Sequence, residues 1–275
     1  MQIIPRNDIT VVYDPSELET VEVISDAVER SLHLIQESWG LGNPEDCWVY
    51  VMTSWQGFFY QSAPWHWRIL LTLTFPFWSS RARRMWPYSA AWTQRYGGRV
   101  AIGIKPPRLL EVSDKSIGRL MFVHENEPKI KIQHLTCHEL THACSTHLKL
   151  PAWLNEGIAA VTVDRLLEKR TIRRDTLDLL RIFKTNERPP TYRKLSRMDT
   201  QAIAYYGVLG YWLVQYLEEV RPGFLKHLFS SPPVSRIFDK AIAAELDIEL
   251  DGLWSKVPGM IFTHFEMTEP GTGAE

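Results

Sequence analysis

The sequence predicts an α+β protein with a small mixed β-sheet in an N-terminal lobe and an all-helical C-terminal lobe. Segments rich in β-forming residues alternate with helical patterns over the first part of the chain. After about residue 120, apolar residues recur only at three-to-four spacing. We therefore expect an α/β lobe over residues 1–120, a helical lobe over residues 121–265 and a flexible polar tail over residues 266–275, all within one unit.

The N-terminal lobe is expected to contain one long helix among three strands. Apolar residues at helical spacing over residues 18–35 predict an amphipathic helix, which Ser16 can cap and Gly40 can end. A second, short helix is expected over residues 55–60. Runs of β-branched and aromatic residues, bounded by turn residues, predict the strands. These strands span residues 9–13, 47–53 and 99–104.

The C-terminal lobe is predicted to consist of helices joined by short connections. Pro151 lies between the first two helices and ends the first of them, because proline cannot continue a helical hydrogen-bond pattern. The later helices follow from apolar periodicity alone. The expected helices span residues 132–147, 153–167, 202–219, 224–229, 234–245 and 250–257.

The composition is that of a globular protein without a bulk preference for polyanions. The 275 residues are 45% hydrophobic and 23% charged, with a formal net charge of −1. The N-terminus lacks a signal-peptide pattern, and no apolar run of about 18 residues predicts a membrane span. Cys47, Cys137 and Cys144 make no disulfide framework. We therefore expect a cytoplasmic protein, with peripheral membrane association left open.

The helix over residues 132–147 contains the pentapeptide His138-Glu139-Leu140-Thr141-His142, an H-E-x-x-H motif. Residues four apart lie on one helix face, so His138 and His142 can reach the same metal ion. Glu139 lies beside them and can act as a general base. The spacing therefore predicts a Zn²⁺ site that carries its own base.

A catalytic zinc site usually has a third protein ligand and an open water position. Glu156 follows the motif in the segment Pro151-Ala152-Trp153-Leu154-Asn155-Glu156-Gly157. A turn at Pro151 allows the second helix to run back beside the first, so that Glu156 completes a His-His-Glu site for one zinc ion. Gly157 is expected to let these two helices approach each other closely.

This two-part signature resembles that of the gluzincin zinc metallopeptidases, and most of all the peptidase MA-like group. Residues 138–142 match H-E-L-T-H, and residues 151–159 match P-x-W-L-N-E-G-I-A. The helix that contains Tyr205 and Tyr206 is similar to the tyrosine-bearing helix of that group, which is distantly related to M1 aminopeptidases and to thermolysin. The resemblance covers most of the chain, with residues 61–95 as the main exception.

The resemblance implies a zincin-like fold, with the H-E-x-x-H helix between two lobes, and zinc-dependent hydrolysis of a peptide or protein substrate. Glu139 is then the catalytic base, and either Tyr205 or Tyr206 stabilises the oxyanion. An edge strand of the sheet is expected to hold the substrate by β-augmentation. The substrate-binding residues on that strand are Val100, Ala101 and Ile102.

The sequence also departs from the family. The aminopeptidase signature G-x-M-E-N is absent, which favours an endopeptidase over an aminopeptidase. Ala160 stands where thermolysin-like enzymes carry a carboxylate that orients a histidine ligand, and Asp164 is the more distant candidate for that task. His134, one turn before His138, is expected either to contact the substrate or to lie on the helix surface.

Residues 61–95 form an insertion rich in tryptophan and arginine, and no acidic residue occurs between Asp46 and Glu111. Such a segment can be a helical lid whose aromatic residues pack on the catalytic domain. It can also bind a membrane surface or an anionic partner, and nucleic acid is the least favoured partner. The alternative to a peptidase is thus a catalytically silent or latent zincin-fold module that docks through this insertion.

Overall fold

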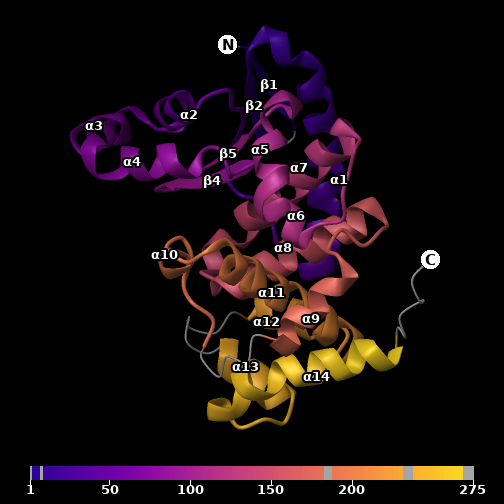
Figure 1. Cartoon of the computed structure of the whole chain (residues 1–275). Helices are drawn as coiled ribbons and strands as arrows, with labels where there is room; N and C mark the ends of the chain where they lie inside the picture. The colour runs from indigo at the N-terminus through magenta and orange to yellow at the C-terminus, as the bar shows by residue number, and fades with distance from the viewer. Residues whose placement is uncertain (1, 7–8, 183–187, 232–237, 269–275) are drawn as a thin grey trace.

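The computed structural model describes residues 2–6, 9–182, 188–231 and 238–268, and it has the predicted α+β architecture (Figure 1). One five-stranded mixed sheet lies within the first 104 residues, and the described residues beyond it are helical apart from loops and one isolated bridge. The predicted tail falls partly at residues 269–275, which lie outside the described residues. Residues 266–268, which were assigned to the tail, belong to the last helix.

The sheet has the order β1-β2-β3-β5-β4. β2 (Ile9–Tyr13), β3 (Asp46–Val51) and β5 (Arg99–Ile104) are mutually parallel and confirm the three predicted strands. Two antiparallel strands that the sequence analysis did not predict complete the sheet. These are β1 (Gln2–Arg6), which pairs with β2, and β4 (Ala91–Tyr96), which pairs with β5.

The prediction that Val100, Ala101 and Ile102 form the edge of the sheet is wrong. β5 pairs with β3 on one side and with β4 on the other, so its backbone is already used in the sheet. The side chains of Ala101 and Ile102 are fully buried as well. The edge strand next to β5 is β4, which begins in the last part of the sequence that was assigned to the insertion, and β1 forms the other edge.

Most predicted helices are found near their expected positions, although the one expected over residues 250–257 runs from residue 253 to residue 268, and the helices within residues 65–85 and 177–195 were not predicted. The motif helix is α7 (Pro128–Ser145). It packs against α1 (Leu18–Trp39), against α8 (Ala152–Leu167) and against strands β4 and β5. The predicted helix over residues 234–245 is described only from residue 238. The remaining helices of the C-terminal part include α9 (Leu177–Ile182), α10 (Tyr192–Leu195), α11 (Thr200–Val220), α12 (Phe224–Ser230), α13 (Phe238–Glu245) and α14 (Leu253–Thr268).

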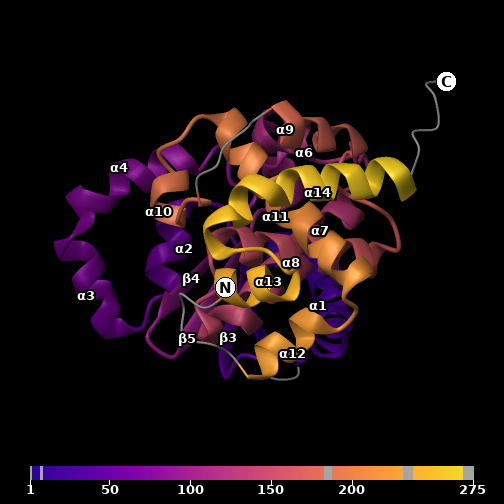
Figure 2. The same ribbon diagram turned by 90° about the horizontal axis from the view of Figure 1, so that it is seen from below.

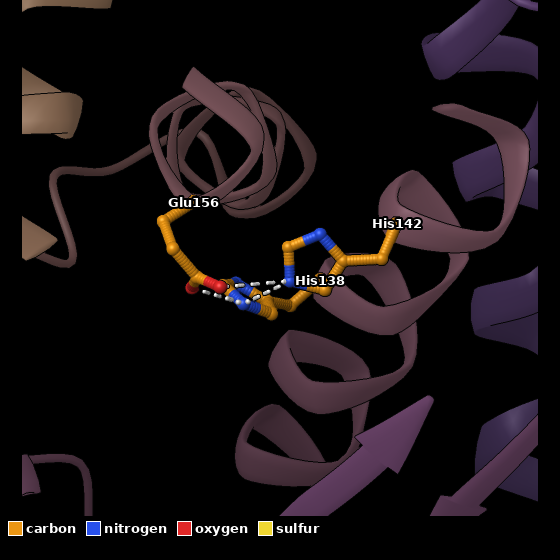
Figure 3. A group of neighbouring side chains, drawn as sticks. All are labelled: His138, His142 and Glu156. Carbon is orange, nitrogen blue, oxygen red and sulfur yellow. Dashed lines mark hydrogen bonds and ion pairs between the residues drawn. The ribbon is translucent and has the colours of Figure 1, made fainter. Parts of the chain in front are cut away.

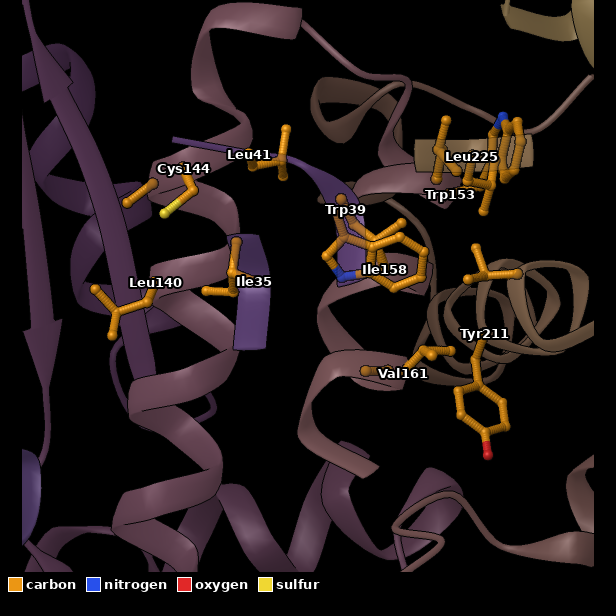
Figure 4. Close-up of a cluster of buried hydrophobic side chains, with 14 of the residues drawn as sticks. Ile35, Trp39, Leu41, Leu140, Cys144, Trp153, Ile158, Val161, Tyr211 and Leu225 are labelled. Carbon is orange, nitrogen blue, oxygen red and sulfur yellow. The ribbon is translucent and has the colours of Figure 1, made fainter. Parts of the chain in front are cut away.

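The core connects the sheet to the helices through large buried side chains (Figure 4). Trp39, at the end of α1, is fully buried, and its indole Nε1 donates a hydrogen bond of 2.7 Å to Thr162 Oγ1 on α8. Leu140 and Cys144 of α7 belong to the same cluster as Ile158 of α8. α1, α7 and α8 are therefore held as one packed layer, and both halves of the zinc signature lie in it.

Helix α8 meets α11 at a contact between two glycines. A Cβ atom added to Gly157 would lie 2.4 Å from the carbonyl oxygen of Gly210, and one added to Gly210 would lie 2.0 Å from the carbonyl oxygen of Trp153. Only hydrogen atoms fit between the two backbones there. The expectation that Gly157 faces the motif helix is therefore wrong, because its Cα faces α11.

Residues 55–85 form a helical arm that projects from the sheet (Figures 1 and 2). It consists of α2 (Trp55–Ser62), α3 (Trp65–Leu73) and α4 (Phe75–Met85). The ring of Trp78 contacts the rings of Trp55 and Phe59 at centroid distances of 5.8 and 5.0 Å, so α4 packs on α2. None of the helices in the described ranges is long and apolar enough to cross a membrane.

We predict that Gly210→Ala lowers the free energy of unfolding by about 1–3 kcal/mol, because the methyl group overpacks the α8–α11 contact. Gly259→Ala is the matched control: Gly259 lies within α14 and has open space around the added Cβ. That substitution should raise stability by about 0.5–1 kcal/mol through helix propensity. Urea denaturation measures both values, and equal effects of the two substitutions would contradict the close contact.

Candidate metal centre

Helix α7 places the two motif histidines on one face, one turn apart. The Nε2 atoms of His138 and His142 lie 3.1 Å from each other, and the two rings meet edge to face with centroids 4.6 Å apart. Both side chains are partly buried. The four-residue spacing therefore brings two imidazole nitrogens to one point, as the sequence predicted.

Helix α8 brings Glu156 to the same point (Figure 3). Its Oε2 atom lies 3.3 Å from His138 Nε2, and its Oε1 atom lies 3.5 Å from His142 Nε2. Ligands at about 2.0–2.1 Å from a tetrahedral zinc ion lie about 3.3–3.4 Å from one another. The three side chains are thus spaced as zinc ligands are, and they could hold a metal ion.

The charges of this group favour a bound cation. Burial by itself would lower the pKa of His138, but the hydrogen bond and negative charge of Glu156 raise that pKa above its ordinary value. Burial would likewise raise the pKa of Glu156, but the neighbouring His142 and His138 lower it to about 2. Glu156 therefore keeps its negative charge at neutral pH. A cation bound between Glu156 and the two histidines can replace the proton that Glu156 helps to hold on His138.

Glu139 lies beside the ligand group and faces a different element. Its side chain is 9% exposed, and Thr93 Oγ1 donates a hydrogen bond of 2.5 Å to its Oε2 atom. Thr93 belongs to the edge strand β4, which packs against α7. The carboxylate of Glu139 is thus held between the motif helix and the edge of the sheet, next to the three ligands.

A large cavity of about 1200 Å³ opens onto this group. His138, Glu139 and Glu156 lie in its wall, together with residues of β4, α10, α11 and the segment from residue 107 to residue 125. A cavity of this size exceeds the volume of most small-molecule pockets. The candidate metal centre therefore lies in a cleft that can take a ligand larger than a typical small molecule.

The structure distinguishes the two predicted tyrosines and adds a third one. Tyr206 lines the cleft, whereas Tyr205 is 1% exposed and belongs to the core behind it. The Tyr206 hydroxyl makes no hydrogen bond to His138, His142 or Glu156 in the part of the chain that the structure describes. Tyr192, on α10, does reach them: its hydroxyl donates to Glu156 Oε1 at 2.7 Å and accepts from Asn155 Nδ2 at 2.8 Å. Burial and the adjacent Glu156 charge raise the pKa of Tyr192 well above its usual value.

The sequence analysis missed both Thr93 and Tyr192. The signal for Thr93 was the alternation over residues 91–96, in which Trp92 faces the aromatic arm while Thr93 faces α7. Tyr192 carried no local signal, since only the path of the chain after α9 brings it to Glu156.

The histidine ligands have no outer partner among the described residues. The Nδ1 atoms of His138 and His142 are buried and make no hydrogen bond there. The expectation that Asp164 orients His142 is wrong, because Asp164 accepts hydrogen bonds from Thr171 and Tyr211 instead. His138 and His142 are therefore positioned by helix packing rather than by a second carboxylate.

His134 proves to be a residue of the cleft wall rather than of the outer helix surface. Its ring packs against Phe122, with centroids 5.1 Å apart, and stacks on His138. Burial and the nearby His138 lower the pKa of His134 to about 3, so its ring is neutral at physiological pH. It offers a neutral hydrogen-bonding group one turn away from the ligands.

Comparison of the chain with protein-family models, with curated proteins and with solved structures finds no match. The geometry of the His138, His142 and Glu156 group, and of the cleft around it, is therefore the basis for assigning a function.

We predict that the purified protein, stripped with a chelator and dialysed against zinc, takes up one zinc ion per chain. Glu156→Ala and His142→Ala should abolish stoichiometric uptake, because each removes one of only three protein ligands. His147→Ala is the control, since this exposed histidine follows α7 outside the ligand group. Elemental analysis after gel filtration measures the content, and full uptake by the Glu156 variant would exclude the assigned ligand set.

Proposed function

We propose that this chain is a zinc-dependent metallopeptidase of the gluzincin type, with a zincin-like fold and one zinc ion held by His138, His142 and Glu156. The observation that supports this most directly is the convergence of the three ligand atoms at zinc-like spacing, with Glu139 beside them in the wall of a large cleft. Two ligands and a base on one helix, and a third ligand on the next, are what hydrolytic zinc chemistry requires.

Zinc bound there would polarise water and the scissile carbonyl group. Glu139 takes the proton of the attacking water and passes it to the leaving amine. The Thr93 hydroxyl donates a hydrogen bond to Oε2 of Glu139. The Oε1 atom of Glu139 is then available for the attacking water. A carboxylate with one oxygen fixed and one oxygen free is oriented for this transfer, and the low exposure of Glu139 limits competition from solvent.

The substrate strand is β4 rather than β5 in this proposal. β4 has a sheet partner on one side only among the described residues, and Thr93 on the same strand contacts the catalytic base. A peptide that adds to this edge in extended form passes directly beside Glu139. Main-chain hydrogen bonds then hold the scissile bond in place, whatever the side chains of the substrate.

Tyr192 is the residue that we assign to the developing oxyanion. Its hydroxyl is already within hydrogen-bond distance of a metal ligand, and its raised pKa keeps it protonated as a donor. Asn155 contacts the same hydroxyl, and Ser145 Oγ donates to Asn155 Oδ1 at 2.8 Å. This chain of contacts positions the phenol from two sides.

The charges of the cleft favour an endopeptidase over an aminopeptidase. Besides Glu139 and Glu156, the acidic residues of its wall are Glu111, Asp114 and Glu125. Each of these three pairs with a lysine, namely Lys115, Lys131 and Lys169 respectively. An aminopeptidase needs a carboxylate for the amino terminus of its substrate, and the described cleft residues offer no unpaired one for that purpose.

A latent or catalytically silent module is the second candidate, and one contact favours latency. Arg81 of the arm donates a hydrogen bond of 2.7 Å to Ser196 Oγ, which lies in the cleft wall beyond α10. The arm thus bridges the cleft on one side. If this bridge restrains the enzyme, Arg81→Ala will raise peptidase activity, whereas a silent module will show no Glu139-dependent cleavage in either form.

We predict that the zinc-loaded protein cleaves unstructured polypeptides internally and that Glu139→Gln lowers kcat by at least about 100-fold, the usual contribution of a general base. Zinc content should not change, because Glu139 is not a ligand. Mass spectrometry of fragments from a denatured protein mixture provides the measurement. Stoichiometric zinc with equal fragment yields from the wild type and the variant would refute the peptidase assignment.

For Tyr192→Phe we predict a fall in kcat of about 100-fold or more at nearly constant KM, since the phenol bonds to the reacting group only when the oxyanion forms in the transition state. Tyr206→Phe should change KM more than kcat, because that residue lines the cleft. Tyr205→Phe is the buried control and should leave both parameters unchanged. Steady-state kinetics on one cleaved peptide separates the three, and an unchanged kcat for Tyr192→Phe would remove this residue from the reaction.

A further inference from the structure

The arm carries a row of exposed apolar side chains, Trp65, Ile69, Leu73 and Phe77. The first three are four residues apart on α3 and therefore lie along one face of that helix. They are 73%, 54% and 73% exposed. Phe77, the third residue of α4, is 85% exposed. We call these four residues the apolar ridge.

The apolar ridge is not needed to hold the arm together. The arm is packed by other aromatic side chains, since Trp78 contacts Trp55, Phe59 and Phe75 within it. Trp67 on α3 packs against Tyr96 of the sheet, with centroids 5.8 Å apart. Of the alternatives for this segment, aromatic packing thus accounts for the inner residues, while the four side chains of the ridge stay largely exposed.

The charge of the arm is positive, and its exposed arginines lack acidic partners in the described part of the chain. No acidic residue occurs between Asp46 and Glu111, a stretch that includes the whole arm. Arg83 and Arg84 are exposed on α4 and form no ion pair among the described residues. Arg68 donates to the backbone carbonyls of Ala63 and Gln61, which leaves its positive charge unpaired.

We propose that the arm docks on the surface of an anionic lipid bilayer, with the apolar ridge inserted among the lipids and the arginines against their head groups. Exposed apolar side chains that include a tryptophan, on an arm whose charges are all positive, match the composition of interfacial helices. Two or more cations near an anionic surface add directly to such binding.

Two other partners fit the ridge less well. Single-stranded nucleic acid binds through stacking on exposed rings, and Ile69 and Leu73, half of the ridge, have no ring to stack on. An acidic protein would need to enclose a projecting ridge in a groove of its own, whereas a bilayer accepts such a ridge without a matching shape. The bilayer therefore accounts for both the apolar and the cationic residues.

Docking has a geometric consequence for the cleft. The arm ends at Met85, which lines the cleft, and Tyr88 follows it in the same wall. A bilayer bound at α3 and α4 would therefore hold the cleft close to the lipid surface. This consequence rests on the proposed peptidase function, but the lipid binding itself does not.

The test is flotation of the full-length protein with vesicles of phosphatidylcholine alone or mixed with phosphatidylglycerol. We expect binding to the anionic vesicles, little binding to the neutral ones, and weakening by salt. The triple variant Trp65→Ser, Leu73→Ser, Phe77→Ser should lose binding. The double variant Arg83→Gln, Arg84→Gln should bind roughly tenfold more weakly or worse.

A matched control removes equally exposed apolar side chains elsewhere. Ile182 and Met267 are 66% and 77% exposed on α9 and α14, and Ile182→Ser with Met267→Ser should bind as the wild type does. Absence of wild-type binding, or equal binding by the triple variant, would overturn the proposal. Retention on immobilised polyglutamate without vesicle binding would assign the arm to an acidic protein and overturn it too.

Folding and function are checked in the same samples. Circular dichroism and zinc content of the triple variant should equal those of the wild type, because the ridge contributes to neither core nor ligands. Cleavage of a soluble peptide should also stay unchanged. If the triple variant loses vesicle binding but still cleaves the peptide, the docking face is supported. If the wild-type protein binds vesicles but cleaves no peptide, the peptidase proposal fails while the docking proposal stands.

Discussion

The site depends on the seating of α8 between α7 and α11. Glu156 lies in the first turns of α8, and the residues around it, Trp153 and Gly157, are those whose backbone touches Gly210 of α11. This contact fixes the depth at which α8 lies, and so the distance from Glu156 to His138 on the opposite side. Because the histidine ligands have no outer hydrogen-bond partner in the described residues, helix packing is what holds the ligand atoms at zinc-like spacing.

Burial then gives this packing an electrostatic role. Two imidazoles and a carboxylate are brought together at partly buried positions, where their opposite charges offset the cost of burial. Glu156 stays ionised through the neighbouring histidines, and His138 holds its proton more tightly through Glu156. Tyr192 adds a neutral donor to the same carboxylate. The group is therefore prepared for a cation by the residues that surround it.

The sequence was sufficient for features that depend on local pattern. Three strands, the main helices and the ligand set all follow from periodicity or fixed spacing, and their positions agree with the structure. The edge of the sheet did not follow, because strand order depends on pairing between distant segments. β4 was not predicted because its residues looked like part of the tryptophan- and arginine-rich insertion. Trp92 packs on the aromatic cluster of the arm, and Arg95 is exposed to solvent. Tyr192 was out of reach because α10 is placed by tertiary packing alone.

Strand β4 joins the two informative parts of the molecule. Alternation along the strand directs Trp92 to the aromatic cluster of the arm and Thr93 to Glu139, one residue apart. The ring of Trp92 contacts Phe59 of α2 and Trp86, just after α4, so any shift of the arm moves the strand that bears Thr93. The hydroxyl that bonds to Glu139, the proposed base, thus lies on a strand that packs against the arm and its apolar ridge. The insertion, which looked peripheral in the sequence, is therefore connected to Glu139 in the cleft through packed side chains of β4.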